Sequence, residues 1–308
     1  MRIRAVLAEP VVVGGRTLPP LGLVVLAALG AVLLLVVATV RWAVPSDEHA
    51  YWLAAQRLVA GQPLYDPTAF PGTPYAYWYP PPLAQVLAPL TPLVPDLAFT
   101  GVWTVLLLAC LWQLADRRVL VALAFVAFVP VAVELWYRNI HLVLAVLAVV
   151  ALRRSPLAWV PAVAIKVTPV IALAYLVAAR RYRDALLVAA VGAAVLAVSV
   201  VVSPGAWRQF VEVVVSQGGT SGASLIPVPF VARFAIAVVL AGVGGRAGGR
   251  AGETLLVIGL VVGNPTLWMT AFSVLIALVP LWRTPRATTG PAAPATPPAP
   301  DRPVGATR

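Results

Sequence analysis

Long apolar runs separated by short polar gaps dominate the hydrophobic pattern of this chain of 308 residues. The first run, Leu21–Val40, holds 20 residues without a charge, which is enough for a helix to cross about 30 Å of hydrocarbon. A secretory signal peptide has an apolar core of only about 7–15 residues and a small-residue cleavage site after it. We therefore interpret Leu21–Val40 as a retained first transmembrane helix.

Later apolar runs predict further membrane segments, several of them short or broken. They are Leu97–Leu114, Val119–Val133, Ile140–Leu152, Pro156–Ala179, Ala185–Val202, Ala223–Ala241 and Thr254–Trp282, the last interrupted at Asn264-Pro265. Pro204–Gln217 has the pattern of an interfacial helix, and we expect a Gly/Arg loop at Gly242–Glu253. The pattern predicts an all-α polytopic membrane protein with about 8–10 membrane segments.

Three regions follow from this pattern. An N-terminal segment, 1–20, precedes a polytopic membrane domain, 21–282, and a proline-rich tail, 283–308, follows it. Within the membrane domain, residues 41–95 are expected to form an extracytoplasmic loop with an acidic cluster and interfacial helices. The tail carries almost no large apolar residue, so we expect it to be disordered and cytoplasmic.

Composition supports the membrane assignment. The chain is 61% hydrophobic and 11% charged, whereas soluble domains have roughly 45–50% apolar and about 25% charged residues. A soluble enzyme and a disordered protein are excluded, and the single cysteine, Cys110, excludes a disulfide-stabilised domain. The net charge of +11 lies mostly in the gaps between apolar runs, which is typical of membrane topology and not of a nucleic-acid-binding surface.

The distribution of charge also predicts the orientation. With both termini in the cytoplasm, the cytoplasmic segments carry a net charge of +11 and the outer segments −1, as the positive-inside rule requires. Arg153-Arg154 and Arg180–Arg183 are then both cytoplasmic, so Pro156–Ala179 enters and leaves on one face. We expect two half-helices that meet near Lys166–Pro169, inside protein or beside a water-filled cavity. The alternative is one span, Leu157–Val177.

Lys166 is the only lysine of the chain and lies in the apolar sequence Ala-Ile-Lys-Val-Thr-Pro. A charge at membrane depth costs several kcal/mol unless it is paired or hydrated, and it usually marks a functional site. An anionic phosphate is a natural partner for a compact ammonium group. The alternative is a lysine that extends to the membrane interface.

An acidic cluster follows the first transmembrane helix. Asp47 and Glu48 lie side by side and His49 follows them, so two carboxylates and an imidazole are expected at the membrane surface. If a helix begins near Ser46, Asp47 and Tyr51 share one face of it. The cluster could equally serve to cap that helix, because acids are favoured in a first turn.

Two more clusters of polar and aromatic residues can each be interpreted either as a binding site or as an ordinary structural feature. Tyr75–Pro82, which contains Tyr79, could be a platform for a sugar ring or a lipid, or an aromatic belt at the interface. Three polar side chains lie together at the outer ends of two predicted segments, those of Arg138, Asn139 and His141. They could form part of a binding site or an ordinary polar turn. The sequence has no P-loop, no dinucleotide-binding glycine motif and no His-Glu-x-x-His zinc motif.

Several short motifs occur in a fixed order after the acidic cluster. They are Ala54–Asp66, Tyr79–Leu83, Asn139 with His141, Lys166–Pro169, Arg180–Arg183 and Asn264–Trp268. Over residues 20–282 this order resembles glycosyltransferase family 87, polyprenol-phosphate-sugar-dependent membrane enzymes of the GT-C type. The chain departs from the family pattern at Arg138, where a glycine commonly precedes the asparagine, and at Met269 and Thr270, where many members carry a histidine.

The resemblance implies an inverting transfer of a sugar, with mannose expected, from a polyprenyl-phosphate donor to a lipid or glycan hydroxyl at the outer face of the plasma membrane. Asp47 matches the aspartate of the family's first loop and would be the general base. The leaving phosphate departs as an anion, so it needs cations such as Lys166. The substrate-binding residues implied are Glu48, His49, Tyr51, Tyr79, Arg138, Asn139, His141, Lys166 and Thr168.

No metal or other cofactor is expected, and the polyprenyl tail would lie between membrane helices among the membrane lipids. A second function stays open from the sequence, a non-enzymatic binder or transporter of a polyprenyl lipid. The breaks at Lys166 and Asn264-Pro265 resemble the discontinuous helices of transporters. This alternative predicts that Lys166 matters for function and Asp47 does not.

Overall fold

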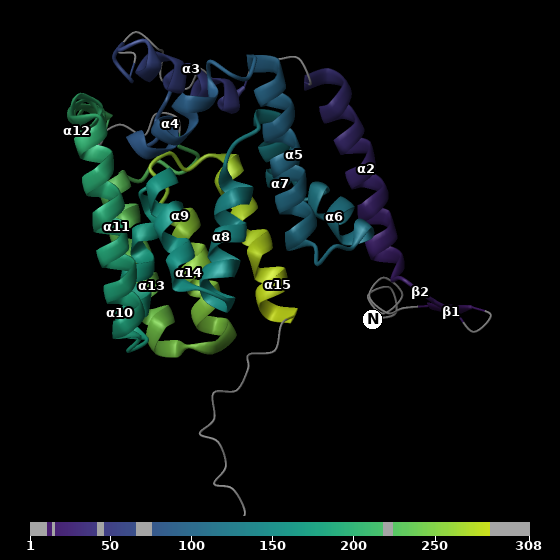
Figure 1. The fold of residues 1–308 in the computed structure, drawn as a ribbon. Coiled ribbons are helices and arrows are strands. Elements are labelled where there is room, and N and C mark those ends of the chain that lie inside the picture. The colour runs from purple at the N-terminus through teal and green to yellow at the C-terminus, as the bar shows by residue number, and fades with distance from the viewer. Residues whose placement is uncertain (1–10, 14–15, 42–45, 66–75, 218–223, 284–308) are drawn as a thin grey trace, which may run out of the picture.

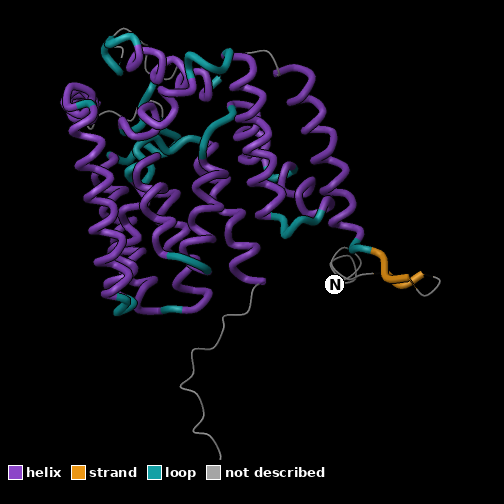
Figure 2. The backbone as a smooth tube through the Cα atoms, viewed as in Figure 1, coloured by secondary structure: helices purple, strands orange, loops and turns teal. Residues whose placement is uncertain are grey.

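The computed structural model describes residues 11–13, 16–41, 46–65, 76–217 and 224–283, and nearly all of this part is helical (Figures 1 and 2). The predicted all-α class is confirmed. Within the described residues the only β structure is an antiparallel ribbon of β1 (Val11–Val13) and β2 (Arg16–Leu18). The tail beyond Arg283, with its expected disorder, and residues 1–10 lie outside the described part.

The α-helices follow one another along the described chain. They are α2 (Leu21–Arg41), α3 (Asp47–Val59), α4 (Pro81–Leu87), α5 (Asp96–Leu114), α6 (Val119–Val126), α7 (Val129–Tyr137), α8 (His141–Arg153), α9 (Trp159–Ile165), α10 (Ile171–Ala178), α11 (Tyr182–Val202), α12 (Pro204–Gln217), α13 (Phe230–Ala247), α14 (Gly249–Val262) and α15 (Leu278–Arg283). Short 3-10 helices lie between some of them: η1 (Ala88–Leu90), η2 (Pro156–Ala158), η3 (Thr168–Val170) and η4 (Met269–Ala277).

Four helices of the described part, α2, α5, α11 and α13, are long and apolar enough to cross a membrane, with 18 to 21 residues each. The pair α6 and α7 makes a fifth candidate if it is counted as one span bent by 84°. Shorter apolar helices pack among them, including α8, α9 and α10. The chain is therefore a multi-pass membrane protein with short and broken helices, as the hydrophobic pattern predicts.

Proline breaks the segment that the sequence predicts as one helix at Val119–Val133. Pro130 has no N–H, and in a continuous helix its ring would collide with the carbonyl group of Val126. The first helix, α6, ends at Val126 for this reason, and α7 starts again at Val129 in a new direction. The segment expected at Val119–Val133 is therefore a pair of helices bent by 84°, which counts as one span only if the two are taken together.

The break expected near Lys166 has the same cause. Pro169 prevents α9 from continuing past Ile165. Lys166 then follows in an extended conformation, with φ −148° and ψ 137°. η3 and α10 resume the helical path after it. Lys166 therefore lies at a true interruption of the helix and not on a helical face.

Both arms of this broken segment reach the same end of the bundle. Arg153, just before it, pairs with Glu253 in the first turns of α14 at 2.5 Å. At the other arm, α10 packs along α13, and a side chain on Gly245 near the end of α13 would overlap the last turn of α10. The segment is thus a re-entrant hairpin of two half-helices, not the single span Leu157–Val177.

The loop expected at Gly242–Glu253 is helical instead. α13 and α14 are joined by Gly248 alone, at φ 61°. A Cβ atom on Gly244 would lie 2.6 Å from the carbonyl oxygen of Gly252, so neither helix tolerates a side chain at the crossing. The glycines here serve close helix packing, and that is why a loop was the wrong prediction.

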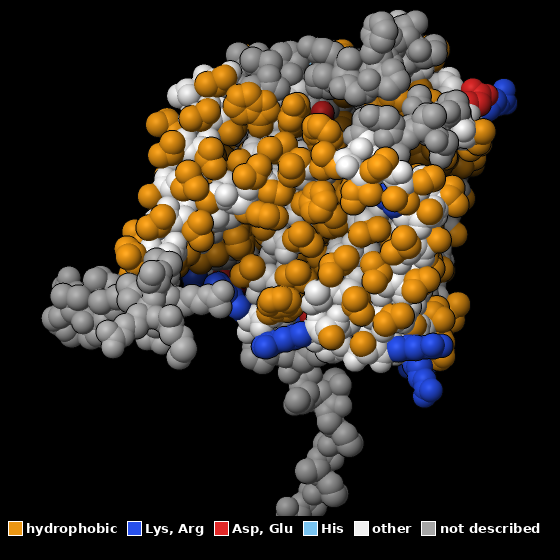
Figure 3. Space-filling view, turned by 180° about the vertical axis from the view of Figure 1, so that it is seen from behind, with side chains coloured by type: hydrophobic (Ala, Val, Ile, Leu, Met, Phe, Trp, Pro, Cys, Tyr) orange, Lys and Arg blue, Asp and Glu red, His pale blue; other side chains and the backbone are white. Residues whose placement is uncertain are grey.

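The two ends of the bundle differ in charge. Helix ends and turns at one end carry Arg117, Arg118, Arg153, Arg154, Arg180, Arg181, Arg246 and Arg250, and we call this the basic end. On the face seen in Figure 3, Arg side chains gather at this end below a broad hydrophobic surface. At the opposite end, α3 and α4 lie across the ends of the longer helices (Figure 1). We call α3, residues 76–80 and α4 the cap.

Two hydrophobic clusters form the core. One lies between the cap, α5 and α7 and includes Tyr51, Trp103 and Leu107. The other joins the hairpin to α8, α13, α14 and η4. α8 begins at His141, under the cap, and reaches Arg153 at the basic end in 13 residues, which is about 20 Å of helix.

Candidate active site

Asp47 begins α3, and its carboxylate accepts a hydrogen bond from the side-chain amide of Asn139, in the turn between α7 and α8. Asn139 Oδ1 accepts two more, from the Ile140 N–H at 2.7 Å and from the Tyr79 hydroxyl at 3.1 Å. The Tyr51 hydroxyl donates in turn to the Tyr79 oxygen at 2.9 Å. Four predicted site residues from distant parts of the sequence thus form one hydrogen-bonded chain.

Burial keeps the two phenols of this chain neutral. Desolvation raises the pKa of Tyr51 and the pKa of Tyr79 well above the usual value of a tyrosine. The two rings also meet edge to face, with centroids 4.9 Å apart. Both tyrosines therefore act as rigid hydrogen-bonding supports that hold Asn139, and through it Asp47, in place.

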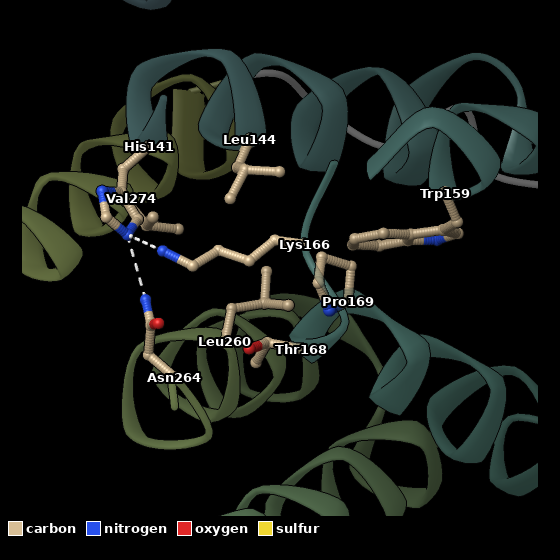
Figure 4. Close-up of a pocket in the computed structure, with 9 residues that line it drawn as sticks. All are labelled: His141, Leu144, Trp159, Lys166, Thr168, Pro169, Leu260, Asn264 and Val274. Carbon is tan, nitrogen blue, oxygen red and sulfur yellow. Dashed lines mark hydrogen bonds between the residues drawn. The ribbon is translucent and has the colours of Figure 1, made fainter. Parts of the chain in front are cut away.

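A second polar cluster centres on His141, the first residue of α8 (Figure 4). On one side of the imidazole, Glu134 Oε2 lies 3.1 Å from Nδ1, and Glu134 Oε1 accepts the backbone N–H groups of His141 and Leu142. On the other side, Lys166 Nζ lies 2.8 Å and Asn264 Nδ2 lies 3.0 Å from Nε2. The imidazole therefore stands between a carboxylate and an ammonium group.

The two clusters meet at Tyr79. Lys166 Nζ lies 5.3 Å from the centre of the Tyr79 ring, which is within cation–π range. Asn139 and His141 are also close neighbours, since Ile140 alone separates them. The structure thus brings a carboxylate, Asp47, and the only lysine of the chain to one place. A carboxylate can take a proton from an attacking hydroxyl, and a cation can stabilise a departing anion.

Glu48 and Arg138, two predicted substrate-binding residues, face each other. Arg138 donates to Glu48 Oε1 at 2.8 Å and to Ser46 Oγ at 3.1 Å, and both charged side chains are buried. Thr100 donates to the same Glu48 oxygen at 3.3 Å. Ser46 makes no capping hydrogen bond with its side chain. The pair ties the start of α3 to the turn before α8, and a direct contact of either residue with substrate stays a prediction.

His49 and Thr168 lie at the edges of the arrangement. His49 pairs with Asp96 at the start of α5, with Nδ1 2.9 Å from a carboxylate oxygen. Thr168 donates to the Gly263 carbonyl at 3.1 Å and so fastens the hairpin to the end of α14. Thr168 also lines a small cavity of about 10 Å³ beside Lys166, whose other polar lining residues are His141 and Asn264 (Figure 4).

Sequence reasoning missed two residues of this site. Arg233 is buried on α13, and its guanidinium donates to four backbone carbonyl groups, those of Val228, Val262, Asn264 and Pro265. It holds the loop that presents Asn264 to His141. Glu134, on α7, was also not among the predicted site residues. A charged residue inside an apolar run is the signal that could have pointed to Glu134 and Arg233.

The chemistry of the donor set gives no sign of a metal centre. In the part of the chain that the structure describes, no group of three or more His, Cys, Asp or Glu side chains is placed to hold a metal ion. Lys166 and Arg138, which stand among the candidate residues, are cations and do not favour a second cation. The expectation that the reaction needs no metal stays a prediction.

The fold and site define a multi-pass helical membrane protein with a polar site enclosed between its cap and its helix bundle. The family model of glycosyltransferase family 87 matches residues 77–296. This is most of the chain, which therefore belongs to glycosyltransferase family 87 and is a membrane glycosyltransferase with a sugar donor and an acceptor. The resemblance drawn from short motifs is confirmed at that level. No curated protein and no solved structure shows significant similarity to the chain.

Proposed function

We propose that this glycosyltransferase moves a sugar, mannose in the first instance, from a polyprenyl-phosphate donor to a hydroxyl group of a lipid or glycan acceptor. The transfer inverts the anomeric carbon and takes place at the outer face of the plasma membrane. One observation carries the proposal: Asp47 and Lys166 converge on Asn139 and Tyr79. The GT-C class and the identity of the donor rest on this chemistry together with the motif resemblance.

Asp47 is the proposed general base. It removes the proton of the acceptor hydroxyl while that oxygen attacks the anomeric carbon, and the bond from the anomeric carbon to the phosphate oxygen breaks on the opposite face. The bonding electrons leave with the phosphate. The amide of Asn139 fixes the carboxylate through its hydrogen bond, so the base is held in one orientation before substrate arrives.

Lys166 is the proposed partner of the departing phosphate. The leaving group is a phosphate anion, so it needs a cation and no second carboxylic acid. Lys166 is partly buried at the break of the hairpin. The helices around it are apolar, so an apolar polyprenyl chain could pack between them. An ammonium group in such surroundings attracts a phosphate more strongly than one in water.

The charge distribution supports the side of the membrane. If the basic end faces the cytoplasm, as the positive-inside rule favours, the cap and Asp47 face outward. A lipid donor in the outer leaflet then needs to move only laterally to bring its phosphate towards Lys166. Both chain termini are cytoplasmic in this arrangement.

Transfer by the purified protein in detergent tests the proposal, with polyprenyl-phosphate-mannose as donor and a crude membrane lipid extract as acceptor. Asp47→Asn should lower the rate by about 100-fold or more. Glu212→Gln, which removes an exposed carboxylate of α12, is the control and should transfer as fast as the unmodified protein. Full activity of Asp47→Asn would refute the assignment of the base.

The same preparation distinguishes the alternative function. A folded protein that binds the donor lipid, forms no product and loses binding in Lys166→Met but not in Asp47→Asn would be a polyprenyl-lipid binder or transporter. The broken hairpin around Lys166 is the observation that keeps this alternative in view. Inversion is tested separately, by the anomeric configuration of the product.

A further inference from the structure

The hydrogen bonds around His141 determine where its ring proton lies. The ammonium group of Lys166 can only donate, and it lies 2.8 Å from His141 Nε2. The amide nitrogen of Asn264 lies 3.0 Å from the same atom and is also a donor. Nε2 must therefore offer its lone pair. A neutral imidazole carries one N–H, which then belongs to Nδ1 and donates to Glu134 Oε2 at 3.1 Å.

Glu134 is held rigidly enough to impose this choice. Its other carboxylate oxygen accepts the first two N–H groups of α8, those of His141 and Leu142. These N–H groups have no partner within the helix, and the helix start favours a negative charge beside it. Glu134 is fully buried on α7. The two backbone hydrogen bonds thus fix the carboxyl group and keep Oε2 directed at His141 Nδ1.

We propose that Glu134 is a positioning residue: it holds His141 in the neutral, Nδ1-protonated tautomer, so that Nε2 gathers the Lys166 ammonium and the Asn264 amide into one donor pair for the sugar donor's phosphate. The role in donor binding rests on the proposed function, whereas the tautomer does not. Glu134 acts only through His141 and need not touch the substrate.

Two hydrogen-bond donors compete for His141 Nε2, and this competition leaves the Lys166 ammonium and the Asn264 amide able to bind a phosphate. Two donors share one lone pair, while the Asn264 side-chain oxygen is buried without a hydrogen-bond partner. One acceptor is therefore too few for the donors gathered there. A phosphate oxygen that enters the cavity beside Lys166 can take both donors and relieve the crowding. Arg233 keeps Asn264 at the required place by binding the backbone of its loop.

The tautomer can be observed directly. The chain contains two histidines, His49 and His141, so protein labelled with ¹⁵N-histidine in the His49→Gln background has a single imidazole. Its two ring nitrogen shifts report which nitrogen carries the proton. We expect Nδ1 protonated and Nε2 unprotonated. An imidazolium ion, or a proton on Nε2, would overturn the proposal.

Glu134→Gln tests whether Glu134 imposes the tautomer. The glutamine oxygen can still accept the two backbone N–H groups of α8, but its NH₂ group would face His141 Nδ1 as a donor. The ring proton should then move to Nε2. Lys166→Met is the matched control, because Glu134 remains, and its spectrum should keep the proton on Nδ1. An Nδ1 proton in Glu134→Gln would show that Glu134 does not set the tautomer.

Transfer kinetics test the consequence for the donor. A proton on Nε2 repels Lys166, so Glu134→Gln should lower kcat/KM for the donor by about 10- to 100-fold and leave the KM of the acceptor unchanged. An unchanged kcat/KM would refute the functional part. If Glu134→Gln does not fold, the spectrum of the protein with Glu134 still decides the tautomer. If no sugar is transferred at all, the proposed function fails while the spectrum remains valid.

Discussion

Replacing Arg138 by glycine sets two effects of known sign against each other. Arg138 ends α7 with φ 50°, in the left-handed region, which costs a residue with a side chain about 1–2 kcal/mol and costs glycine nothing. The same change removes the cation that pairs with buried Glu48. Leaving a buried charge unpaired costs about 3–5 kcal/mol. Arg138→Gly should therefore destabilise the protein by about 1–4 kcal/mol in sum.

Thermal unfolding in detergent measures this effect. At about 2–4 °C per kcal/mol, a loss near the middle of that range lowers Tm by about 5–10 °C. Adding Glu48→Gln to Arg138→Gly removes the unpaired charge and keeps an oxygen for the Thr100 hydroxyl. The double variant should therefore melt above Arg138→Gly alone. A double variant no more stable than the single one would refute the reasoning.

Arg117→Gly is the matched control. Arg117 also has a left-handed conformation, with φ 59°, but lies exposed in the turn between α5 and α6. Glycine relieves the strain there without removing a buried ion pair, so Tm should stay the same or rise. If Arg138→Gly also leaves Tm unchanged or raises it, the ion pair with Glu48 does not hold the cap to the α7–α8 turn.

Three further predictions concern the site and the packing of α2. Tyr79→Phe removes the hydroxyl that donates to Asn139 but keeps the ring beside Lys166. The kcat of sugar transfer should fall by about 3- to 10-fold, with the donor KM nearly unchanged. A rise in the donor KM without a fall in kcat would contradict this. Lys166→Arg keeps the charge but cannot fit a guanidinium into a cavity of about 10 Å³, so donor KM should rise, and an unchanged KM would count against a close fit. Gly30→Ala should lower Tm because its methyl group overlaps the backbone of α6, whereas Gly192→Ala, with open space around it, should not.

Much of the helical framework could be predicted from the hydrophobic pattern. The spans expected at Leu21–Val40 and Leu97–Leu114 agree with α2 and α5 to within a residue or so, since an uninterrupted apolar run has no other stable form in a bilayer. The break near Lys166 followed from the arginines on both sides. The Gly242–Glu253 error has a physical cause, because glycine composition alone cannot distinguish a loop from a close helix crossing.

The site was only partly predictable for a different reason. A polar residue inside a membrane segment is conspicuous, so Lys166, Asn139 and His141 could be selected one by one. Their partners could not, because a hydrogen bond between distant segments leaves no local pattern. Two examples are the ion pair of Glu48 with Arg138 and the hydrogen bond from Arg233 to the backbone carbonyl of Asn264. Both depend on the packing of several helices, which only the folded chain reveals.

The shortness of α8 has an electrical consequence. Its 13 residues put His141 only about 20 Å from the basic end, whereas the hydrocarbon layer is about 30 Å thick. If the proposed phosphate donor draws water to Lys166, most of the membrane voltage falls across the apolar residues below it, which include the fully buried Leu176 and Leu256. These side chains would then act as an electrical barrier as well as core, and a void among them would be measured as a leak of ions.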